Sequence, residues 1–131
     1  MNSTYLFVYG TLLKDSNHEM SKFLASHSVF VSKGYFNGKL FLVEWFPGAI
    51  LSDHNLDRVY GSVFKINNPT VVFNVLDDYE GLGESNSKPH LFKRETITIF
   101  LEKHTKIKAW VYLYNHSTGK LKRIISGNFI T

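Results

Sequence analysis

Near its start the chain carries Tyr5-Leu6-Phe7-Val8-Tyr9-Gly10-Thr11-Leu12, an apolar run that ends at a glycine. The β-favouring residues 5–8 predict a strand, and Gly10 allows the backbone to turn sharply where that strand stops. The peptide N–H groups of residues 10–12 are then not needed for sheet pairing, and such a group of donors can bind a carboxylate or a developing oxyanion. The alternative is an ordinary turn between a strand and a loop.

A second segment, Leu76-Asp77-Asp78-Tyr79-Glu80-Gly81, ends a run with helical spacing. Asn68 and Pro69 are typical of the first residues of a helix, and the glycine at 81 is typical of a residue just after its end. Helical spacing places four residues on one largely apolar face, namely Val72, Leu76, Tyr79 and Glu80. We therefore expect Glu80 to point inward and its neighbours Asp77 and Asp78 to be solvated.

Glu80 is the candidate catalytic residue. Partial burial, the negative end of the helix dipole and the charge of Asp77 one turn away would all raise the pKa of Glu80, whereas a cation such as Arg94 would oppose the shift. A carboxyl group whose pKa is raised toward neutrality can accept a proton and return it. The alternative is a surface glutamate at a frayed helix end.

The remaining pattern predicts strands at residues 29–36, 39–43, 59–66, 92–101 and 106–115, with a helix at 17–26. Asn37-Gly38 predicts a hairpin between the first two of these strands, and Phe46-Pro47-Gly48 predicts a turn. Mostly strands with a few helices at intervals indicate a single α+β domain over residues 1–131, whose sheet curls toward a barrel.

Composition excludes several classes of site. With 44% apolar and 15% aromatic residues, the chain is not of a disordered type. The absence of cysteine excludes disulfides, thiolate metal sites and cysteine nucleophiles, and the six histidines show no metal-binding spacing. No segment resembles a signal peptide or an apolar run of roughly 20 residues, so we expect a cytoplasmic protein. The net charge of +4 comes from scattered basic residues, which favours a solvated surface over a nucleic-acid site.

Two further side chains could reach a ligand. Arg94 alternates in phase with Phe92 and Thr96, and it either pairs with a carboxylate at the pocket or lies outside it. Tyr112 could donate a hydroxyl hydrogen bond to a ligand, or its ring could pack in the core.

Taken in order, these segments resemble the gamma-glutamylcyclotransferase-like superfamily, in the small branch that includes the gamma-glutamylamine cyclotransferases. Residues 7–12 are similar to the opening strand and substrate loop, and residues 76–81 to the segment with the catalytic glutamate. Nearly the whole chain is covered, because the resemblance extends to Phe46-Pro47-Gly48-Ala49, residues 59–64, Phe92-Lys93-Arg94, Ala109-Trp110-Val111-Tyr112 and Ser126-Gly127-Asn128-Phe129. The chain departs from the family pattern at Ser62, where an acid is common, at Phe92 for tyrosine, and at Phe129 for tryptophan.

The resemblance implies a small mixed β-barrel with a few flanking helices and a pocket for a γ-glutamyl group. It implies that the substrate's α-amine attacks its own γ-carbonyl, which forms 5-oxoproline and releases an amine or amino acid. Glu80 would act as general base and acid, without a metal or organic cofactor. The substrate contacts would come from Tyr9, Gly10, Thr11, Leu12, Arg94 and Tyr112.

The expected partner is a small-molecule γ-glutamyl substrate, with no nucleic acid and no membrane, bound by a monomer or weak homodimer. One alternative is a non-catalytic module that binds a small metabolite in the same pocket. A weaker alternative is a basic barrel that binds nucleic acid, which would show salt-dependent affinity.

Overall fold

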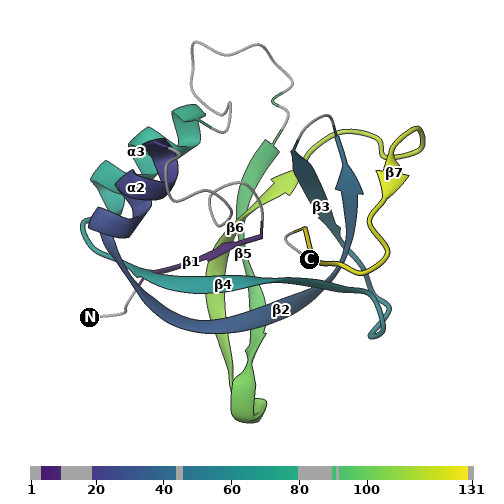
Figure 1. The fold of residues 1–131 in the computed structure, drawn as a ribbon, viewed down its shortest axis with the longest axis horizontal. Helices are drawn as coiled ribbons and strands as arrows, with labels where there is room; N and C mark the ends of the chain where they lie inside the picture. Colours follow the sequence, from purple (N-terminus) through teal and green to yellow (C-terminus); the bar gives the residue numbers. More distant parts are fainter. Residues whose placement is uncertain (1–3, 10–18, 44–45, 80–89, 91, 130–131) are drawn as a thin grey trace.

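The computed structural model describes residues 4–9, 19–43, 46–79, 90 and 92–129. Within these residues a closed barrel is formed by β1 (Tyr5–Val8), β2 (Ser28–Leu42), β4 (Arg58–Ile66), β5 (Phe92–Leu101) and β6 (Lys106–Tyr114) (Figure 1). The strand order is β2-β4-β1-β6-β5, and β5 pairs with β2 again to close the circle. The barrel is mixed, because β1 runs parallel to β6 and antiparallel to β4.

Shorter elements surround the barrel. β3 (Pro47–Leu51) and β7 (Lys122–Arg123) both pair with the C-terminal part of β2, and a short 3-10 helix, η1 (Glu102–His104), joins β5 to β6. The helices α2 (Glu19–Ser26) and α3 (Pro69–Tyr79) lie together against one side of the barrel (Figure 1). The predicted α+β class and mixed barrel with flanking helices are confirmed. No helix in the described part of the chain is long and apolar enough to cross a membrane.

Two hydrophobic cores share the wall of the barrel. Phe7, Phe36 and Val63 belong to the core inside it, whereas Leu6 and Val8 belong to a second core that α2 and α3 cover. Successive side chains of a strand point to opposite faces, so β1 is buried on both sides. This explains its unbroken apolar sequence, because a strand covered on both faces has no reason to alternate with polar residues.

Helix α3 follows the predicted pattern at its start and along its buried face. Pro69 is its first residue, and Asn68 precedes it with a φ of 55°, a left-handed conformation that asparagine adopts more readily than most residues. Val72 and Leu76 are fully buried, as the helical spacing predicts. Tyr79, the last residue of the helix, is 36% exposed, so the inward face opens toward solvent at this end.

The predicted hairpin at Asn37-Gly38 is wrong, because β2 continues through it as one strand of 15 residues. Asn37 pairs with Arg58 of β4, and the next residue, Gly38, pairs with Leu51 of β3. The glycine is needed because a Cβ there would lie 2.4 Å from the Phe36 ring. Asn-Gly therefore marks the point where β2 passes from one partner strand to the next. The turn predicted at 46–48 is also wrong, since Pro47 and Gly48 belong to β3.

The C-terminal residues 124–129, here called the closing segment, hydrogen-bond to β4 beyond the point where β1 ends. The last pair between β1 and β4 is Val8 with Ser62, and two residues earlier on β4 the Tyr60 N–H donates to the Gly127 carbonyl at 2.8 Å. Before this segment, Arg123 bonds to Asp57 at 2.8 Å. Hydrogen bonds from Ser52 and Arg123 lower the pKa of Asp57. The closing segment is therefore fixed at the end of β1.

We expect Gly127→Ala to lower the free energy of unfolding by about 2 kcal/mol. Gly127 has a φ of 72°, and a left-handed conformation costs a residue with a side chain about 1–2 kcal/mol. An added Cβ would also lie 1.8 Å from the Arg58 carbonyl oxygen. Urea titration measures the change. Gly119→Ala is the matched control, because its nearest neighbour would be Ser117 Oγ at 3.8 Å. Equal stability of the two variants would contradict the expectation.

Candidate functional site

Tyr9 anchors the start of the predicted substrate loop. Its hydroxyl donates to the Tyr112 carbonyl oxygen at 2.6 Å and accepts from the Ala49 N–H at 3.1 Å. The side chain is 6% exposed, so the phenol joins the end of β1 to β6 and β3 from within the core. Gly10, Thr11 and Leu12, the other predicted loop residues, lie outside the described residues.

Asp77 is the centre of a charged cluster between α3 and the barrel. Arg94 of β5 bonds both carboxylate oxygens of Asp77, Nε to Oδ1 at 2.8 Å and Nη2 to Oδ2 at 3.1 Å. Tyr112 of β6 donates its hydroxyl to Oδ1 at 2.7 Å. Two parallel N–H···O bonds fix both the distance and the orientation of an arginine–carboxylate pair. We call Asp77, Arg94 and Tyr112 the Asp77 cluster.

Two aromatic rings pack against the guanidinium of the cluster, and they also contact each other edge to face. The Cζ atom of Arg94 lies 4.2 Å from the centre of the Phe73 ring and 4.5 Å from that of the Trp110 ring. Such cation–π contacts are stronger where the cation is removed from water, and Arg94 is 22% exposed. Of the two alternatives for Arg94, the structure shows pairing with a carboxylate. That carboxylate belongs to the protein itself.

The expectation that Asp77 is solvated is wrong, whereas Asp78 is exposed as expected. The side chain of Asp77 is 26% exposed and carries three hydrogen bonds. One signal was available in the sequence. Asp77 follows the buried Phe73 by four residues, so the two are neighbours on one side of the helix.

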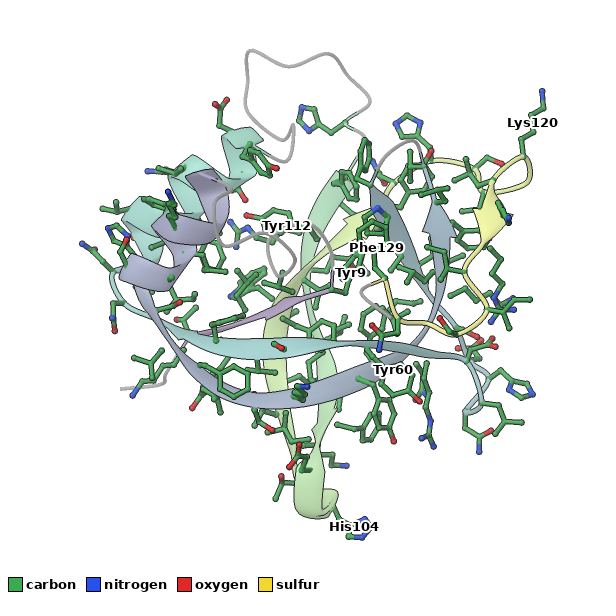
Figure 2. The ribbon with its side chains drawn as sticks, viewed as in Figure 1. Tyr9, Tyr60, His104, Tyr112, Lys120 and Phe129 are labelled. Carbon is green, nitrogen blue, oxygen red and sulfur yellow. The ribbon has the colours of Figure 1, made fainter. Side chains whose placement is uncertain are left out.

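Tyr112 connects the two segments that the sequence singled out. Its hydroxyl bonds to Asp77 near the end of α3, and its carbonyl oxygen accepts from Tyr9 at the end of β1. Figure 2 shows Tyr9 and Tyr112 together in the middle of the molecule, where these elements meet. Glu80 is the third residue after Asp77 in the chain and lies outside the described residues. The cluster therefore fixes the point on the barrel from which the chain continues to Glu80.

A hollow of about 560 Å³ lies near the end of β1 on its β4 side, whereas Tyr112 of the Asp77 cluster lies on its β6 side. Tyr9 lines it, together with residues of β2, β4, the end of β5 and the closing segment. Its volume is in the range of small-molecule sites. Among the described residues, no group of three or more His, Asp and Glu side chains is arranged to hold a metal ion.

Residues 6–130 match the family model described as "Gamma-glutamyl cyclotransferase, AIG2-like". The chain belongs to this family. The match includes residues 6–12 of the first predicted segment, the whole second segment, the Asp77 cluster and the whole closing segment, so the site described above lies within the region that the family model matches.

Individual relatives carry names that are consistent with this family. The chain is 28% identical to a Methanocaldococcus jannaschii protein named "Putative gamma-glutamylcyclotransferase", over 95% of this chain and 94% of that one. An AIG2-like protein of mouse has a TM-score of 0.68 at 18% identity, over 92% of this chain and 82% of that one. YkqA of Bacillus subtilis has a TM-score of 0.70 at 21% identity over 97% of this chain, which spans 39% of YkqA. At these identities the two solved structures show a shared fold.

Proposed function

We propose that this AIG2-like family member is a gamma-glutamyl cyclotransferase that converts a γ-glutamyl amine or a γ-glutamyl amino acid to 5-oxoproline. The observation that supports this most is the pair of hydrogen bonds made by Tyr112. Its carbonyl oxygen accepts from Tyr9 at the end of β1, and its hydroxyl donates to Asp77 near the end of α3. These are the two elements that lead into the substrate loop and into Glu80. Family membership supports the same chemistry.

In the proposed reaction the substrate's α-amine attacks its own γ-carbonyl carbon. A C–N bond forms and closes the five-membered ring, and the bond from the γ-carbon to the leaving nitrogen breaks. Glu80 takes the proton from the α-amine and gives one to the leaving nitrogen. Both reacting groups belong to one molecule, so the substrate itself supplies their proximity, and the protein contributes proton transfer and the ring-closing conformation. No cofactor takes part in these steps.

Binding and positioning are divided between two sets of residues in this proposal. The backbone N–H groups of residues 9–12 hold the polar groups of the substrate, including the oxyanion that develops on the γ-carbonyl. Arg94 and Tyr112 bond to Asp77, which supports a positioning role for both side chains. They hold the end of α3 against the barrel, and Glu80 is the next residue after that end.

A screen of γ-glutamyl amines and γ-glutamyl amino acids tests the proposal, with 5-oxoproline and the released amine measured by mass spectrometry. We expect equal amounts of the two products from at least one compound. The matched control is the α-glutamyl isomer of each compound, whose leaving amine is not bonded to the γ-carbon and should not be released. If no compound gives 5-oxoproline, while 5-oxoproline or glutamate raises the unfolding temperature, the chain is a binding module and the proposal fails.

A further inference from the structure

The outer surface of the barrel beyond the end of β1 carries a set of polar and aromatic side chains. Across β2 and β4, Lys33 pairs with Ser62 and Tyr35 pairs with Tyr60. Val59 and Val63, which alternate with Tyr60 and Ser62 along β4, are fully buried in the core inside the barrel. Because cross-strand partners share a face of the sheet, all four polar side chains belong to the outer face. They line the hollow beside Tyr9.

Aromatic rings form a prebuilt wall of this hollow. Tyr35 stacks on Phe100 of β5, with ring centres 5.2 Å apart and planes 24° apart, and its ring lies 5.9 Å from that of Tyr60. Arg58 covers Tyr35 at 4.4 Å from the ring centre. Tyr35 is thus held by its neighbours, whereas Tyr60 stays 38% exposed. A fixed aromatic wall with an exposed ring favours a ligand with a flat apolar group.

Charged groups at the hollow are available to a ligand. Lys33 and Glu102 both line it, and within the described part of the chain neither forms an ion pair. An unpaired ammonium beside an aromatic wall is suited to a carboxylate attached to an aromatic group. Glu102 disfavours a second, acidic group on the same ligand, because like charges repel. The hollow therefore matches the carboxylate and side chain of an aromatic amino acid.

The strand register places this hollow within reach of the Asp77 cluster. Lys33, Ser62 and Val8 lie in one row across β2, β4 and β1. The parallel pair Leu6 with Trp110 sets Val8 alongside Tyr112. With strands about 4.8 Å apart, Ser62 is about 10 Å and Lys33 about 14 Å from the Tyr112 position. An extended γ-glutamyl dipeptide has a similar length. Because Val8 is buried under the helices, one molecule spans the two sites by passing beyond the end of β1 and not across Val8.

We propose that the hollow is the leaving-group subsite and that it selects γ-glutamyl amino acids with an aromatic side chain and a free carboxylate. Lys33 binds the carboxylate, and Tyr60 with the Tyr35–Phe100 pair takes the ring. This inference rests on the proposed cyclotransferase function and narrows its substrate class from amines and amino acids to aromatic amino acids.

Matched substrates test the subsite through kcat/KM. γ-Glutamyl-phenylalanine and γ-glutamyl-phenethylamine differ in the carboxylate alone, and γ-glutamyl-alanine lacks the ring. We expect kcat/KM for the phenylalanine compound to exceed both others at least about 10-fold, in keeping with a charge-assisted contact. Lys33→Met keeps the aliphatic stem and should bring the phenylalanine-to-phenethylamine ratio near one. Lys65→Met, an exposed lysine on β4 outside the hollow, should leave that ratio as it is in the parent.

Binding of free phenylalanine, followed by NMR titration, separates failure of the subsite from failure of the reaction. We expect phenylalanine to bind more tightly than phenethylamine, and Lys33→Met and Tyr60→Ala each to weaken it at least about 5-fold. If no compound gives 5-oxoproline but phenylalanine binds in this way, the ligand assignment stands and the proposed reaction falls. If 5-oxoproline forms equally fast from the matched pair, or phenylalanine does not bind, the subsite is overturned.

Discussion

Replacing Glu80 by glutamine should lower kcat for a γ-glutamyl substrate at least about 100-fold, the usual scale for loss of a general acid–base group. Glutamine keeps the size of the side chain and its ability to hydrogen-bond, but it cannot accept and return a proton. The loss should therefore appear in kcat, with KM nearly unchanged. Steady-state assays of 5-oxoproline formation measure both constants.

Glu84→Gln provides the matched control for this experiment, because it makes the same chemical change four residues along the chain. We expect Glu84→Gln to keep the parental kcat, and both variants to keep the parental unfolding temperature. Full activity in Glu80→Gln would remove Glu80 from the mechanism. Loss of activity together with a lowered unfolding temperature would instead assign the effect to stability.

The second large effect is expected at Asp77, where Asp77→Ala should lower the free energy of unfolding by about 3 kcal/mol. The substitution leaves the Arg94 guanidinium packed against two rings without its counter-charge, and it removes the acceptor of the Tyr112 hydroxyl. Because both charged side chains keep about a quarter of their surface exposed, the cost is placed at the lower end of the range for broken buried pairs. Urea titration measures it.

Asp78→Ala is the natural comparison, since this neighbouring carboxylate is exposed and its loss should change stability by less than about 0.5 kcal/mol. A double-mutant cycle with Arg94→Met adds a sharper test, because removing both charges should cost less than the sum of the single changes. At temperatures where Asp77→Ala is folded, its kcat should also fall, as the end of α3 loses its attachment. Equal stability of the Asp77 and Asp78 variants would contradict the role given to the cluster.

The spacing of apolar residues and the helix-start residues predicted those elements whose form depends on residues close in the sequence. Alternation identified β5 with its exact bounds, and Pro69 identified the start of α3. The hairpin prediction at Asn37-Gly38 failed because the same two residues can form a turn or lie within a long strand, and the choice depends on distant partners in β3 and β4. The fold class was predictable for a different reason, namely the order of several short motifs along the chain.

The candidate site shows the same division. The sequence named Tyr9, Arg94 and Tyr112 as candidates, but it did not indicate which residues they hydrogen-bond in the structure. Asp77 lies 17 residues from Arg94, and Tyr9 lies 103 residues from Tyr112, so no helical or strand spacing relates the members of either pair. Asp77 looked solvated because its own helix gives it no partner. The lining of the hollow by Lys33, Tyr35 and Tyr60 was not predicted, because these residues meet only through the register of β2 and β4.

The position of β1 between β4 and β6 has a consequence for how the chain acquires its structure. Leu6 takes its place beside Trp110, so closing the barrel requires a loop of more than a hundred residues to form. Contacts between such distant residues slow folding. The intervening chain loses conformational entropy before the strand pairing contributes favourable free energy. During synthesis the apolar residues of β1 cannot pair with β6 until β6 has left the ribosome. We therefore expect slow refolding for a domain of this size, with β1 exposed to aggregation until its last partner arrives.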